Sequence, residues 1–126
     1  MTIVHGEMTI SAVLETLLHR LDMEAAVAVV GPDGVVIEQR SAGEPANLEM
    51  LSAGNTSLLK QARIFLRDTS KGEPSELILT SDRQLCIARV VAREYFLLVA
   101  LGSEASLGRL RYETRRASLL LEDELH

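Results

Sequence analysis

A hairpin whose first strand is entirely apolar lies in the N-terminal half of the sequence. Residues 25–30 read AAVAVV and are followed by GPDG and then VVIEQ. Proline favours a turn and Gly34 tolerates positive φ, so antiparallel strands are predicted over roughly 24–31 and 34–40. A strand that is apolar on both faces is typical of a sheet covered on both sides. The chain is therefore expected to fold in three layers.

Three further segments carry apolar residues at helical spacing. They cover 9–22, 48–67 and a closing segment that begins at Leu107. Apolar residues three or four positions apart form one face of a helix, so each segment is predicted to be a helix with one buried face. Side chains that could cap the helix starts are Thr9 or Ser11, Asn47, and Ser103 or Ser106.

The middle of the second predicted helix is a block of small residues, SAGNTS (52–57). A glycine inside a helix costs about 1 kcal/mol relative to alanine, so Gly54 weakens an isolated helix. Small side chains also let another helix approach closely. The block therefore indicates a close packing surface.

Three strands are predicted between the second and third helices, over roughly 75–80, 84–91 and 95–101. Short turns separate them, as in a meander of hairpins. The fold class is thus α+β, with a five-stranded antiparallel sheet, helices on both faces and the order αββαβββα. Residues 1–8 show no pattern and are expected to be a flexible lead-in, whereas residues 9–126 form a single domain.

Composition narrows the class of protein. The chain has 126 residues, a formal net charge of −5 and one cysteine. This charge argues against binding to nucleic acid or to an anionic membrane surface. No apolar run approaches the roughly 20 residues of a membrane span, and no signal peptide is visible. A cytoplasmic protein without an internal disulfide is expected.

Residues for catalysis or metal binding are few. The histidines are His5, His19 and His126, and nothing in the pattern pairs any of them with Cys86. A cysteine in an apolar strand is most often an inert core residue. A metal site would require His5, Glu7 and His126 to converge from the chain ends. Neither an enzyme nor a bound cofactor or metal is predicted.

The strand ELILT (76–80) contains neither proline nor lysine, the residues that usually protect a sheet edge. At an edge it could pair with the same strand of a second copy, and the two second helices would then lie side by side over the seam. The residues expected at this dimer interface are Met50, Gly54, Ser57, Gln61, Ile64, Glu76, Ile78 and Thr80.

Two predicted helices carry basic faces. Lys60, Arg63 and Arg67 are three or four positions apart on the second helix and are expected to share one exposed face. The four arginines of the last helix either contact an acidic partner or pair with Glu113 and nearby acids at helical spacing; the pairing is favoured. They are Arg109, Arg111, Arg115 and Arg116.

The sequence resembles the roadblock/dynein light-chain family, which includes bacterial MglB-like regulators. The resemblance rests on AAVAVVGPDGVVIEQ, LEMLSAGNTSLLKQA, LCIARVVAREYFLLVAL and LGRLRYETRRA, in this order, and covers roughly residues 9–121. Second helices of the family are often richer in alanine, whereas polar and small residues interrupt this one.

This resemblance implies a homodimer, or a heterodimer with a related chain, formed through the second helix and third strand. It further implies a non-catalytic platform that binds a Ras-like small GTPase and can stimulate GTP hydrolysis by arranging the GTPase's own residues. The GTPase-binding residues that it suggests, on the outer side of the paired helices, are Glu49, Lys60, Arg63 and Arg67.

Two alternative functions remain open at the level of sequence. The first is a structural adaptor in a motor, motility or signalling complex, with no effect on GTP turnover. The second is a small-molecule sensor of the PAS or profilin kind, which needs a cavity with convergent polar groups. The low aromatic content of 3% and the lack of an internal polar set argue against the sensor.

Overall fold

The computed structural model describes residues 9–43 and 47–125; the expected lead-in (1–8) lies outside the described residues. The order of elements is the predicted one. The helices are α1 (Ile10–Leu21), α2 (Leu48–Asp68) and α3 (Leu107–Glu122), and the strands are β1 (Ala25–Val30), β2 (Val36–Ala42), β3 (Glu76–Thr80), β4 (Gln84–Val91) and β5 (Tyr95–Gly102).

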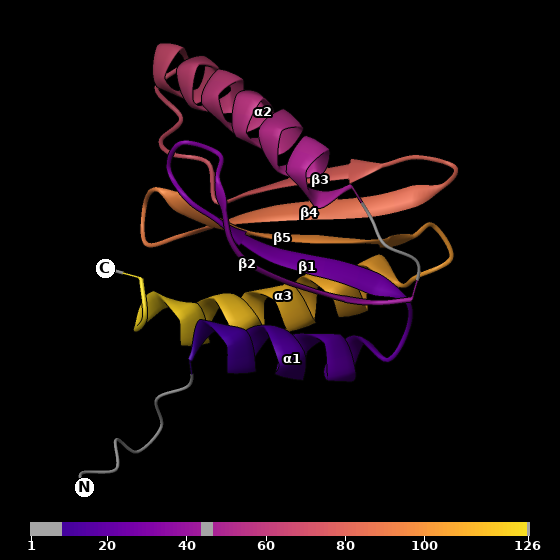
Figure 1. Ribbon diagram of the computed structural model, residues 1–126. Coiled ribbons are helices and arrows are strands. Elements are labelled where there is room, and N and C mark those ends of the chain that lie inside the picture. The colour runs from indigo at the N-terminus through magenta and orange to yellow at the C-terminus, as the bar shows by residue number, and fades with distance from the viewer. Residues whose placement is uncertain (1–8, 44–46, 126) are drawn as a thin grey trace, which may run out of the picture.

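The five strands form one open antiparallel sheet in the spatial order β2-β1-β5-β4-β3. Helices α1 and α3 cover one face of the sheet, and α2 crosses the other face (Figure 1). The predicted three-layer α+β architecture is confirmed. Strand β3 lies at one edge, as the meander allows, and β2 lies at the other.

Each face of the sheet has its own core. Val27 and Val29 of β1 pack on the side of α1 and α3, while Ala26, Ala28 and Val30 pack on the side of α2. All six residues of β1 are buried, as the AAVAVV run predicts. Three of the strand residues in the α2-side core, Ala26, Ala28 and Ala88, are alanines.

Local signals in the sequence place the helix starts correctly and locate the hairpin turn, but not its length. Thr9, Asn47 and Ser106 each accept a hydrogen bond from a backbone N–H in the first turn of their helices. Gly34 has a φ of 85° in the turn. The Gly31 N–H donates to the Val35 carbonyl at 2.9 Å, so the turn is wider than predicted and β2 begins at residue 36.

Among the described residues, none of the helices combines the length and the apolar content that crossing a lipid bilayer requires.

Candidate protein-interaction surface

The two edges of the sheet differ in how they are protected. The β1–β2 pairing shifts register between Val29 and Val30, a local irregularity of the kind that keeps edge strands from pairing further. Strand β3 pairs with β4 in one continuous register, from Glu76 opposite Arg89 to Thr80 opposite Leu85. The β3 edge is therefore the better template for another strand.

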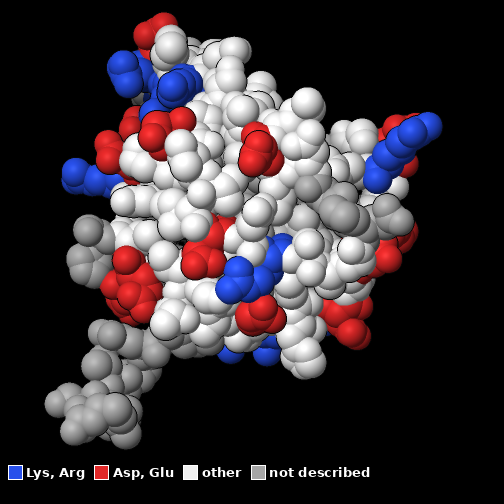
Figure 2. All heavy atoms as spheres, viewed as in Figure 1, with Lys and Arg blue, Asp and Glu red and all other residues white. Residues whose placement is uncertain are grey.

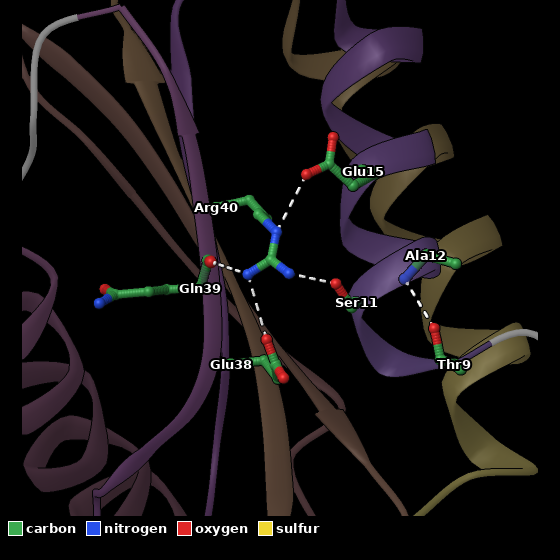
Figure 3. A network of polar contacts seen from close by, with 7 residues as sticks. All are labelled: Thr9, Ser11, Ala12, Glu15, Glu38, Gln39 and Arg40. Atoms are coloured by element: carbon green, nitrogen blue, oxygen red, sulfur yellow. Dashed lines mark hydrogen bonds and ion pairs between the residues drawn. The ribbon is translucent and has the colours of Figure 1, made fainter.

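Charged side chains reinforce this difference, because Arg40 ties the β2 edge to α1 (Figure 3). Its Nε donates to Glu15 Oε1 at 3.0 Å, and its Nη1 donates to Glu38 Oε2 at 3.1 Å and to the Gln39 carbonyl at 2.6 Å. Its Nη2 also donates to the Ser11 hydroxyl. A strand joining at β2 would meet this charged network.

The side of α2 that points away from the sheet is apolar and exposed. Met50 is 70% exposed, Ile64 54% and Phe65 66%. They lie on one helical side with Gly54, Ser57, Leu58 and Gln61, and we call this set the α2 outer face. The opposite side of the helix buries Leu48, Ser52, Asn55 and Leu59. Exposed apolar side chains gathered in this way are typical of a protein-interaction site.

The structure divides the expected dimer residues into two groups. Met50, Gly54, Ser57, Gln61 and Ile64 are all exposed on the α2 outer face. The β3 members Glu76, Ile78 and Thr80 direct their side chains to the opposite face of the sheet. Glu76 accepts a hydrogen bond from Arg111 of α3, and Ile78 packs against the core beneath α1 and α3.

On β3, the side chains on the α2 side are Leu77 and Leu79, which alternate with the expected residues. Leu77 packs against the α2-side core, and Leu79 is 47% exposed. Sequence reasoning missed Leu79, and it also missed Leu58 and Phe65 on α2. The alternation of ELILT separates the two sets of side chains but does not say which set lies beneath α2.

Glu76 is the centre of an ion-pair cluster within the chain. Its Oε1 accepts from Arg89 Nη1 at 2.7 Å, and its Oε2 accepts from Arg111 Nε at 2.8 Å. The Glu76 side chain is 11% exposed. This carboxylate therefore joins β3, β4 and α3.

The four residues suggested for GTPase binding differ in their exposure to solvent. Glu49, Lys60 and Arg67 are exposed on one flank of α2, and Figure 2 shows basic and acidic side chains intermixed at the C-terminal end of this helix. Arg63 is half-buried instead: its Nη2 donates to the Arg93 carbonyl at 3.0 Å, and its Nε lies 3.8 Å from Glu73 Oε1.

Arg63 lines an open hollow of about 540 Å³ beside the C-terminal half of α2. Its other lining residues are Glu73, Pro74, Val90, Arg93 and Glu94. Acidic and basic groups line the hollow in equal number, so it offers no net charge to a ligand. It is an open recess beside α2.

Beneath α2, Asn55 donates to the Leu51 carbonyl at 2.8 Å and to Cys86 Sγ at 3.7 Å. Burial raises the pKa of the Cys86 thiol, and the Asn55 hydrogen bond lowers it by less. A protonated, buried thiol is a poor nucleophile. Within the described ranges, no group of three His, Cys, Asp or Glu side chains could hold a metal ion.

Solved structures of bacterial proteins share this architecture. MglB of Myxococcus xanthus matches with a TM-score of 0.82 at 17% sequence identity, over 91% of this chain and 93% of that chain. The Roadblock/LC7 domain from Streptomyces avermitilis matches with a TM-score of 0.78 at 18% identity, over 89% and 93%. This chain has the roadblock fold. MglC of M. xanthus, at 28% identity, covers 90% of this chain and 96% of its own with a TM-score of 0.62.

The amino-acid sequence by itself matches no protein-family model and no curated protein significantly. The structural matches to MglB and to the Roadblock/LC7 domain nevertheless confirm the family resemblance that the sequence motifs suggested. The free β3 edge belongs to the sheet that forms the middle layer, and α2 covers one face of that sheet.

Proposed function

We propose that this chain is a non-catalytic dimeric regulator or scaffold that binds a Ras-like small GTPase. The observation that carries the proposal is the combination of an apolar α2 outer face with an unprotected β3 edge in a roadblock fold. Each feature is costly in an isolated chain, because exposed apolar surface and free strand edges promote association. A second copy, or a related chain, would cover both at once.

The spacing of the α2 outer face suits a two-fold axis. Gly54 and Gln61 lie three and four residues from Ser57, and Met50 and Ile64 each lie seven residues from it. In an antiparallel pair of α2 helices, Ser57 would therefore face its own copy, and Gly54 would lie close to Gln61 of the other copy. A Cβ at Gly54 would meet no described atom within 4 Å, so the chain's own packing does not require glycine there.

The GTPase assignment is supported by the resemblance and by the exposed charges beside this seam. Lys60 and Arg67 lie on the flank of α2, free to meet an acidic partner surface. Arg63 is held by Arg93 and Glu73, so it is not poised to enter another protein's active site as an arginine finger. Any stimulation of hydrolysis would come from positioning the partner's switch residues and attacking water.

Reversing the charge of Lys60 and Arg67 is expected to weaken GTPase binding about tenfold, because two attractive contacts become repulsive. The test is affinity capture from native cytosol with and without a non-hydrolysable GTP analogue, followed by titration of the captured GTPase. Arg83→Glu is a charge-reversal control away from α2, since Arg83 is an exposed arginine in the turn between β3 and β4. Equal binding by Lys60→Glu/Arg67→Glu and by wild type would remove this flank from the site.

A structural adaptor is the second candidate, because the same dimer could hold a larger complex without affecting nucleotide turnover. Single-turnover GTP hydrolysis with the captured GTPase separates the two functions. Faster hydrolysis in the presence of this chain supports the regulator. Binding that leaves the rate unchanged, or capture that is indifferent to nucleotide, supports the adaptor.

A further inference from the structure

The arginines of α3 do not pair within their helix, contrary to the pairing favoured from the sequence. Glu113 is 7% exposed and accepts a hydrogen bond from Arg20 Nε of α1 at 2.7 Å. This hydrogen bond raises the pKa of the Arg20 guanidinium above its ordinary value. Arg109 Nη2 donates to the Arg20 carbonyl at 2.6 Å, and Arg111 pairs with Glu76. Glu113 and the arginines have the helical spacing that ion pairs require, but Glu113 is buried against α1 and pairs with Arg20 instead.

Arg115 and Arg116 are exposed, and within the described residues neither guanidinium group forms an ion pair or a hydrogen bond, although the Arg115 backbone carbonyl accepts from the Ser118 hydroxyl at 2.7 Å. Tyr112 and Leu119 lie beside them and are 63% and 62% exposed. These four residues are at positions i, i+3, i+4 and i+7 of α3, so they form one surface. We call it the α3 outer patch.

The α3 outer patch combines two arginines that have no acidic partner among the described residues with two exposed large apolar side chains. Two arginines without acidic partners remain in a chain whose net charge is −5. Tyr112 and Leu119 flank the two arginines and are about 10 Å apart along the helix axis at a rise of about 1.5 Å per residue. This spacing fits the apolar stripe of another helix, and the arginines fit carboxylates beside that stripe.

We propose that the α3 outer patch docks an acidic amphipathic helix of a partner protein. Apolar side chains of that helix, two turns apart, cover Tyr112 and Leu119, and its flanking carboxylates pair with Arg115 and Arg116. An extended anionic surface such as a membrane or nucleic acid is disfavoured, because it would also meet the acidic remainder of the chain. A short helix would contact only the patch and not the acidic remainder of the chain.

The patch lies on the face of the sheet opposite to α2 (Figure 1). Its occupant would therefore leave the α2 outer face and the β3 edge free. The chain could hold a partner on α3 while a second copy or a GTPase is bound on the α2 side. The docking site thus goes beyond the proposed function and does not depend on it.

The test uses a fluorescent synthetic peptide of about 20 residues, built from repeats of Glu-Leu-Ala-Glu-Leu-Ala-Glu, titrated with the full chain and followed by anisotropy. Saturable binding is expected, and it should weaken as salt rises because ion pairs are screened. Arg115→Glu/Arg116→Glu should weaken it at least tenfold, and Tyr112→Ala/Leu119→Ala several-fold. Arg115→Lys/Arg116→Lys should restore most of the binding lost with Glu. In ¹⁵N spectra, the shifted amides should be those of α3.

Three controls decide the result. Lys60→Glu/Arg67→Glu changes charge by the same amount on the opposite face and should leave the affinity unchanged. A peptide of the same composition with the leucines spread around the helix should bind at least tenfold more weakly. Circular dichroism checks the fold of each variant. Shifts centred on α2, equal loss with both charge-reversed pairs, or no saturation below about 1 mM peptide would overturn the proposal, as would tighter binding to phosphatidylserine vesicles or duplex DNA.

Discussion

Leu79→Lys is expected to turn the proposed dimer into a monomer without unfolding the chain. Leu79 is 47% exposed on the α2 side of the β3 edge, so a lysine there can reach solvent in the monomer. In a pair of β3 strands, the same ammonium would be buried against its copy. We expect the dimer dissociation constant to rise at least about 100-fold, or about 3 kcal/mol. Sedimentation equilibrium measures this directly.

Leu119→Lys is the control, because Leu119 is also an exposed leucine, at 62%, and lies on the opposite face of the molecule. It should sediment like wild type. Ile78→Lys is less informative, since Ile78 packs against the core of α1 and α3 and its substitution should damage the fold itself. If both leucine variants have the mass of wild type, the interface does not include β3.

Glu76→Ala is expected to destabilise the fold by about 2–3 kcal/mol. Removing this carboxylate leaves Arg89, 22% exposed, without its acidic partner, and breaking a largely buried pair costs more than losing a surface pair. The melting temperature should fall by about 10 °C at equal protein concentration. Urea denaturation of the variant and the wild type checks the free energy of unfolding.

Arg111→Ala separates the two arms of this cluster. The Arg111 side chain is 57% exposed, so its loss should cost well under 1 kcal/mol. If Glu76→Ala leaves the stability unchanged but weakens the dimer, Glu76 belongs to the dimer interface, as expected from the sequence. A stability loss with an intact dimer assigns Glu76 to the fold.

The sequence was sufficient for the architecture because each element carried its own signal. The apolar β1 predicted a covered sheet, the helical stripes predicted α1, α2 and α3, and Asn47 and Ser106 marked helix starts. These signals are local: they depend on side-chain periodicity and on turn and cap chemistry within a few residues. The elements can therefore be predicted from these signals without knowledge of the tertiary packing.

The surface was harder to predict because it depends on which face of each element meets a neighbour. The strand ELILT predicted an edge strand, yet the side of Glu76 and Ile78 was decided by the placement of α3. Arg63 has the helical spacing of an exposed residue, but Arg93, 30 positions along the chain, draws it inward. Phe65 is apolar and lies within the predicted helix 48–67, yet its side chain is 66% exposed.

A cysteine at Ser57 tests the central claim, that two α2 outer faces meet about a two-fold axis, most directly. If the helices cross there, two Ser57→Cys side chains come within the roughly 4.5 Å between Cβ atoms that a disulfide requires. The native Cys86 is 3% exposed and should not interfere. Under mild oxidation at low protein concentration, Ser57→Cys should form a covalent dimer rapidly, whereas Leu119→Cys should not. Equally slow cross-linking at both positions would contradict the account.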